Sequence, residues 1–89
     1  MASCFRYRIA GRVQGVGYRI WSQSVALDLG VTGYVKNLQN GDVEVVACGS
    51  SEALALLQSR LFIGPRYAKV KNVETEARSV EAFELFEIR

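Results

Sequence analysis

The 89-residue sequence contains no histidine, a single proline, two cysteines and two aspartates. The absence of histidine excludes histidine phosphatases, Ser-His hydrolases and most zinc sites. Asp28 and Asp42 are the only aspartates, so there is no paired-aspartate phosphatase motif. Neither Cys4 nor Cys48 is followed six residues later by arginine, which excludes the loop of the cysteine phosphatases. Any chemistry in this chain must therefore use arginine, backbone amides and water.

Long apolar runs and a strong charge imbalance are also missing. No apolar segment approaches the roughly 18 residues that a membrane span needs, and the N-terminal segment does not resemble a secretory signal. The net charge of +2 is too small to indicate nucleic acid as a partner. Apolar residues make up 49% of the chain, which is typical of a folded protein. We expect one domain over residues 1–89, monomeric, cytoplasmic and independent of membranes and nucleic acids.

The most informative stretch is Gly11-Arg12-Val13-Gln14-Gly15-Val16-Gly17-Tyr18-Arg19. A strand-like alternation precedes it and a helical periodicity begins at Tyr18. Glycines allow positive φ, so that successive N–H groups can converge, and a helix N-terminus adds further unpaired N–H groups. This combination is suited to holding a phosphate or another oxyanion. Arg19 would add a planar, permanently charged group at its rim.

Two common phosphate motifs do not fit this stretch. A dinucleotide fingerprint needs a glycine at the position of Ile20, and a P-loop needs a lysine, yet none precedes Lys36. An ordinary strand-to-helix turn, with glycines needed only for its geometry, remains an alternative on spacing alone.

The remaining periodicities predict strands at 4–11, 31–38, 43–48, 67–78 and 82–88. They predict helices at 18–29 and from Ser50 or Ser51 to Gly64-Pro65. Asn40-Gly41 indicates a hairpin turn, which places Asn37 at the end of a strand. The phase slip over Val70–Val73 suggests a bulge. This order favours an α+β fold, the ferredoxin-like split βαβ sandwich. We expect an antiparallel sheet of four to five strands with two helices on one face.

Two segments resemble the signatures of the acylphosphatase family. Residues 9–19, ending in Gln14-Gly15-Val16-Gly17-Tyr18-Arg19, are similar to its first signature. Residues 33–43, with Asn37 and followed by Gly49, are similar to its second. The likeness extends over essentially the whole chain to Phe86-Glu87-Ile88. Tyr18 departs from the family pattern, which usually has phenylalanine there, and we expect its hydroxyl to lie beside the loop.

The resemblance implies metal-independent hydrolysis of small acyl phosphates to a carboxylate and inorganic phosphate, without a cofactor. Acetyl phosphate, carbamoyl phosphate and 1,3-bisphosphoglycerate are substrates of the implied class. The resemblance also implies a role for each site residue. Arg19 and Asn37 would be catalytic, with Asn37 orienting the attacking water. The phosphate would be bound by Gly15, Val16, Gly17, Tyr18 and Arg19.

Two other functions are consistent with the same fold. RNA-binding modules of this plan display aromatic residues on their central strands, whereas Val43–Cys48 has none and contains Glu44. An RNA-binding role is therefore disfavoured. A catalytically silent anion-binding module remains open, and turnover of acetyl phosphate would distinguish it from an enzyme.

The two cysteines fall on strands that neighbour one another in the expected fold. Cys4 begins the first strand and Cys48 ends the third, so an antiparallel pairing brings them within reach of a disulfide. A cytoplasmic location favours two reduced thiols instead.

Overall fold

The computed structural model describes residues 2–89, and its elements follow the expected order. These are β1 (Ala2–Arg12), α1 (Tyr18–Leu29), β2 (Thr32–Asn37), β3 (Val43–Ser50), α2 (Ser51–Ile63), β4 (Lys69–Arg78) and β5 (Phe86–Ile88). The prediction for the first helix is confirmed at both ends. Gly30 ends it with φ 71°, and the N–H groups of Gly30 and Val31 donate to the carbonyls of Leu27 and Ala26.

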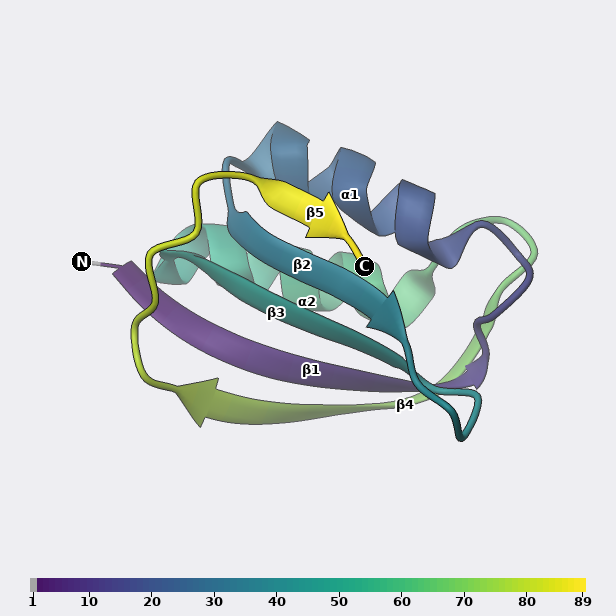
Figure 1. The fold of residues 1–89 in the computed structure, drawn as a ribbon. Helices are drawn as coiled ribbons and strands as arrows, with labels where there is room; N and C mark the ends of the chain where they lie inside the picture. The colour runs from purple at the N-terminus through teal and green to yellow at the C-terminus, as the bar shows by residue number, and fades with distance from the viewer. Residues whose placement is uncertain (1) are drawn as a thin grey trace.

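The five strands form one sheet in the order β4-β1-β3-β2-β5 (Figure 1). β5 runs parallel to β2, so the expectation of a purely antiparallel sheet is wrong. The chain reverses direction between β4 and β5, and β2 also runs opposite to β4 because three antiparallel pairings separate them. β5 is also shorter than the predicted segment 82–88. The predicted bulge is confirmed, because Ala10 pairs with Asn72 and Gly11 with Val70, which leaves Lys71 unpaired in β4.

Both helices pack on one face of the sheet, as predicted. α1 lies over β2 and β5, whereas α2 lies over β1, β3 and β4. Alternate side chains of the strands point into the core between these layers, and the helices contribute their apolar stripes. Buried core residues include Tyr7, Ile9, Val35, Val45 and Ala47 from the sheet, Tyr18, Val25 and Ala26 from α1, and Leu54, Leu57 and Leu61 from α2. None of the helices in residues 2–89 is long and apolar enough to cross a membrane.

The face of the sheet away from the helices contains a charged group, Glu44, the second residue of β3, which is only 7% exposed. Its carboxylate accepts from Arg6 at 2.5 Å and from the Tyr34 hydroxyl at 3.0 Å, and Lys36 lies 3.8 Å away. Burial by itself raises a carboxyl pKa. The hydrogen bonds from Arg6 and Tyr34, together with the nearby positive charges, nevertheless hold the pKa of Glu44 below its ordinary value. Glu44 is therefore a paired structural charge.

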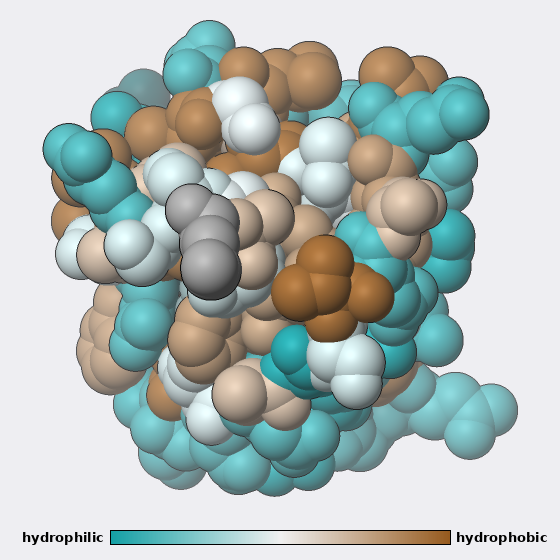
Figure 2. All heavy atoms as spheres, turned by 90° about the vertical axis from the view of Figure 1, so that its left-hand side faces the viewer, coloured by the Kyte–Doolittle hydropathy of each residue, from teal (hydrophilic) through white to brown (hydrophobic). Residues whose placement is uncertain are grey.

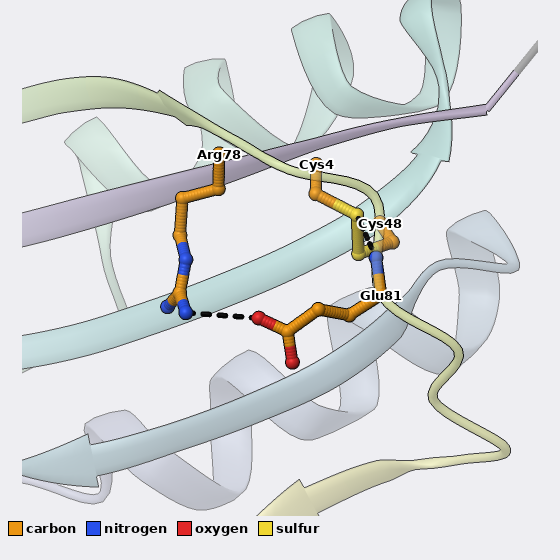
Figure 3. The surroundings of a disulfide bond; sticks show 4 residues. All are labelled: Cys4, Cys48, Arg78 and Glu81. Atoms are coloured by element: carbon orange, nitrogen blue, oxygen red, sulfur yellow. Dashed lines mark hydrogen bonds and ion pairs between the residues drawn. A yellow bond between two sulfur atoms is a disulfide. The ribbon is translucent and has the colours of Figure 1, made fainter.

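A disulfide joins Cys4 and Cys48, which face each other across the β1–β3 ladder with their Cα atoms 4.1 Å apart (Figure 3). The segment after β4 passes over this bond. The backbone N–H of Glu81 lies 3.5 Å from the sulfur of Cys4, and the Glu81 carboxylate pairs with Arg78 at 2.9 Å. Figure 2 shows the molecule from this end, where hydrophobic side chains form separate groups among hydrophilic ones.

Reduction of this disulfide is expected to lower the free energy of unfolding by about 3–4 kcal/mol. The cysteines are 44 residues apart, and opening a loop of that length restores conformational entropy to the unfolded chain. Urea unfolding of oxidised and fully reduced protein measures the difference. A C4A/C48A double variant is the control, because added reductant should not change its unfolding. Identical curves for the oxidised and reduced protein would contradict a stabilising role for the bond.

Candidate active site

The two segments singled out in the sequence meet at one end of the sheet. β1 and β2 both pair antiparallel with β3, so they run in the same direction and their C-terminal ends lie at the same edge. The loop of residues 13–17 follows β1 and leads into α1, whereas Asn37 is the last residue of β2. We call residues 13–17 the cradle loop. This end of the sheet is opposite to the disulfide.

The cradle loop is shaped by two glycines with left-handed backbone conformations. Gly15 has φ 74° and Gly17, the N-cap of α1, has φ 78°. No side chain caps α1, and no acidic residue lies in its first turn. α2 differs, because the Ser50 hydroxyl accepts from the N–H of Ala53 at 3.1 Å. The first amides of α1 thus have no side-chain partner, and together with the dipole of the helix they favour an anion at this position.

Arg19 lies in the first turn of α1 and is partly exposed. Its Nη1 donates to the backbone oxygen of Arg89 at 3.4 Å, a long contact that brings the end of the described chain close to the guanidinium. Within residues 2–89, no carboxylate forms an ion pair with Arg19. Its positive charge therefore has no side-chain carboxylate as a partner among residues 2–89.

Asn37 is exposed, and within the described chain its side chain makes no hydrogen bond. An asparagine beside a hairpin turn often bonds to the local backbone, but here Asn40 has that role and Asn37 does not. The Asn40 side chain accepts from the backbone N–H of Asp42 at 3.0 Å, and Leu38 N–H donates to the Asp42 carbonyl at 2.8 Å. The carboxamide of Asn37 therefore keeps both a donor and an acceptor for a bound molecule.

One pocket of about 110 Å³ contains both segments. It is lined by Val13, Gly15, Gly17, Tyr18, Arg19, Ile20 and Asn37. Its volume is well below the roughly 300–1,000 Å³ of sites that enclose a drug-sized ligand. The sequence did not predict that Val13 and Ile20 line the pocket. Ile20 is an apolar residue next to the charged Arg19, and the structure leaves it 70% exposed. The pocket has room for a small group only, and its lining includes both the charged Arg19 and the apolar Ile20.

The hydroxyl of Tyr18 does not lie beside the cradle loop, so that expectation is wrong. The side chain is buried and donates to the carbonyl of Leu61 at 2.6 Å, in the last turn of α2. The last carbonyls of a helix have no partner within the helix, and this hydroxyl satisfies one of them. Burial raises the pKa of Tyr18, so the phenol stays protonated and remains a donor. Only the backbone of Tyr18 can contribute to an anion site in the loop.

Replacing Tyr18 with phenylalanine is expected to lower the free energy of unfolding by about 1–2 kcal/mol, because the Leu61 carbonyl loses its donor while buried. For a domain of this size, that loss lowers Tm by roughly 4–16 °C. Thermal unfolding followed by circular dichroism measures the change. Tyr67→Phe is the matched control, since Tyr67 is 70% exposed and should melt like the wild type. Equal Tm values for the two variants would show that the hydrogen bond contributes no stability.

No group of three or more histidine, cysteine, aspartate or glutamate residues is placed to hold a metal ion within residues 2–89. Metal independence stays a prediction, because it has to be measured on the protein in solution.

The strand order and the helix placement define a ferredoxin-like α+β protein. Residues 5–88 match the family model described as Acylphosphatase. A protein of Vibrio parahaemolyticus named acylphosphatase is 47% identical over 85 residues, which cover 96% of this chain and 94% of the relative. The solved structure of an acylphosphatase from Coxiella burnetii has a TM-score of 0.96 and 41% identity, covering 99% of this chain and 93% of that one. The crystal structure of acylphosphatase from Bacillus subtilis has a TM-score of 0.95 and 34% identity, covering 100% and 99%.

The chain belongs to the acylphosphatase family, and the resemblance seen in its two sequence signatures is confirmed. It is therefore an enzyme that hydrolyses acyl phosphates.

Proposed function

We propose that the cradle loop and Arg19 hold the phosphoryl group of a small acyl phosphate while Asn37 orients the water that attacks it. The single observation that carries this proposal is the shared pocket, which brings Gly15, Gly17 and Arg19 together with Asn37. In this proposal, residues 1–89 form one acylphosphatase domain.

The chemistry of an acyl phosphate matches what this pocket contains. The leaving carboxylate has a conjugate acid with a pKa of about 4, so its departure requires no general acid. The charged oxygens on phosphorus need neutralisation, which the amides of residues 15–19 and the Arg19 guanidinium would supply. Arginine suits this task because its planar fork can donate to two oxygens at once.

Asn37 has the properties needed to position a water molecule. Its carboxamide can donate one hydrogen bond to the water and accept another from it, which fixes the direction of the oxygen lone pair toward phosphorus. An amide does not remove a proton, so a different acceptor is required. The phosphoryl group has a second pKa near ~6, and one of its own oxygens is the acceptor in this proposal.

The face of the sheet that the helices do not cover argues against the RNA-binding alternative. The ring of Tyr34 is already in contact with Phe83, at 6.1 Å between centroids, and with the Arg89 guanidinium at 4.1 Å. A base would have to displace these groups before it could stack on Tyr34.

Steady-state hydrolysis of acetyl phosphate, carbamoyl phosphate and 1,3-bisphosphoglycerate tests the proposal. We expect turnover without added metal, unchanged after exhaustive chelation, because the proposed roles use only amides, an arginine and an asparagine. p-Nitrophenyl phosphate, a phosphate ester, is the comparison substrate. Chelation that abolishes turnover until magnesium or zinc is returned would contradict metal independence. No turnover of any acyl phosphate would identify a silent anion-binding module instead.

A further inference from the structure

The cradle loop is tied to the Asn37 hairpin by one side chain that the proposed mechanism does not use. Gln14 immediately precedes Gly15, and its Nε2 donates to the carbonyl of Leu38 at 2.8 Å and to that of Asp42 at 2.9 Å. Both neighbours are acceptors, so the amide nitrogen must face them and both of its protons are used. Leu38 is the residue after Asn37, so this contact reaches the base of the hairpin next to the proposed water-orienting group.

The hairpin does not need Gln14 in order to close. The Leu38 carbonyl also accepts from Gly41 N–H at 3.2 Å, and the Asp42 carbonyl also accepts from Leu38 N–H at 2.8 Å. Asn40 adds its own bond to the turn. The two bonds from Gln14 are therefore additional to a turn that is already complete. What they add is a fixed distance between the turn and the cradle loop, 24 and 28 residues apart in sequence.

We infer that Gln14 is a positioning residue, which sets the place of Asn37 relative to the phosphate held in the cradle loop. This inference rests on the proposed function, because it presumes that Asn37 orients the attacking water. Effective attack requires the water to lie in line with the bond that breaks, and a displacement of about 1 Å can reduce the rate by 10²-fold. Gln14 acts on that alignment without touching the reacting atoms.

The test is a double-mutant cycle with Gln14→Met and Asn37→Ala, assayed with acetyl phosphate. Methionine has nearly the same length as glutamine and no donors. In the wild-type background we expect Gln14→Met to lower kcat by about 10- to 100-fold. The inhibition constant of inorganic phosphate should stay within about twofold, since the cradle loop keeps its amides. In the Asn37→Ala background the same substitution should lower kcat less than about twofold, because no oriented side chain remains to be displaced.

Two further variants keep this test decisive. Gln23→Met is the matched control, since Gln23 also donates to a backbone carbonyl, that of Phe86 at 3.0 Å, and this contact does not involve the hairpin. Its kcat should stay within about threefold of the wild type, because the contact that is lost is part-buried and lies away from the hairpin. Gln14→Asn keeps both donors on a shorter side chain, so we expect an intermediate kcat. It replaces Gln14→Met in the cycle if that variant does not fold.

Three results would overturn the inference. They are an unchanged kcat for Gln14→Met, an equal fall in kcat in the two backgrounds, and a weakening of phosphate inhibition that matches the fall in kcat. A different result would contradict the proposed function itself. If Asn37→Ala alone retains a normal kcat, Asn37 does not orient the water, and there is no group for Gln14 to position.

Discussion

Arg19→Ala is expected to lower kcat/KM for acetyl phosphate by about two to three orders of magnitude. Removal of one preorganised electrostatic contact commonly costs on the order of 3 kcal/mol in the transition state. Arg19 is the only charged side chain that lines the pocket in the described part of the chain, and no side-chain carboxylate there forms an ion pair with it. Inhibition by inorganic phosphate should weaken as well, because the same contact holds the product. Steady-state kinetics with a phosphate inhibition series measures both effects.

Two companion variants show whether the loss belongs to this guanidinium or only to its charge. Arg19→Lys keeps the charge and loses the planar fork, so it should recover little of the activity. Arg78→Ala changes the net charge of the protein by the same amount at the opposite end of the sheet, where Arg78 pairs with Glu81. Its kcat/KM should stay close to that of the wild type. A near-normal kcat/KM for Arg19→Ala would remove Arg19 from the site.

Asn37→Ala should lower kcat by about 100-fold while leaving the inhibition constant of phosphate nearly unchanged. The side chain is proposed to act on the water and not on the ground-state anion, so its loss affects turnover and not affinity. The matched control is Asn72→Ala, an exposed asparagine on β4, which should behave like the wild type. If phosphate inhibition weakens by the same factor as kcat, Asn37 binds the phosphate and does not orient the water.

Local patterns were sufficient to predict most of the fold. The spacing in the first helix predicts an inward stripe of Tyr18, Ser22, Val25, Ala26 and Leu29. The first four are buried, and Leu29, in the last turn, is half-buried. The C-terminal region was harder to predict, because β5 depends on which edge of the sheet remains open after β4 has paired with β1. A segment of three paired residues carries little periodicity of its own. Its parallel direction follows from the topology and not from its composition.

The candidate site was predictable to the extent that its residues lie in two recognisable segments. The pocket brings Arg19 and Asn37 together, as the parallel directions of β1 and β2 require. The direction of the Tyr18 hydroxyl was not predictable, since it depends on where α2 ends in space. The contact of Gln14 with the hairpin was missed for the same reason, because it joins two loops that are distant in sequence. The cytoplasmic location and the monomeric state stay predictions.

The most direct measurement of the central claim is a titration of the ¹⁵N-labelled protein with inorganic phosphate, followed by backbone amide chemical shifts. We predict that the largest shifts fall on the amides of Gly15, Val16, Gly17, Tyr18 and Arg19. They should saturate with a single Kd equal to the inhibition constant of phosphate, and Arg19→Ala should weaken that Kd. If the amides of residues 15–19 do not shift at phosphate concentrations that inhibit turnover, the account is contradicted. Shifts clustered on the face of the sheet away from the helices would contradict it as well.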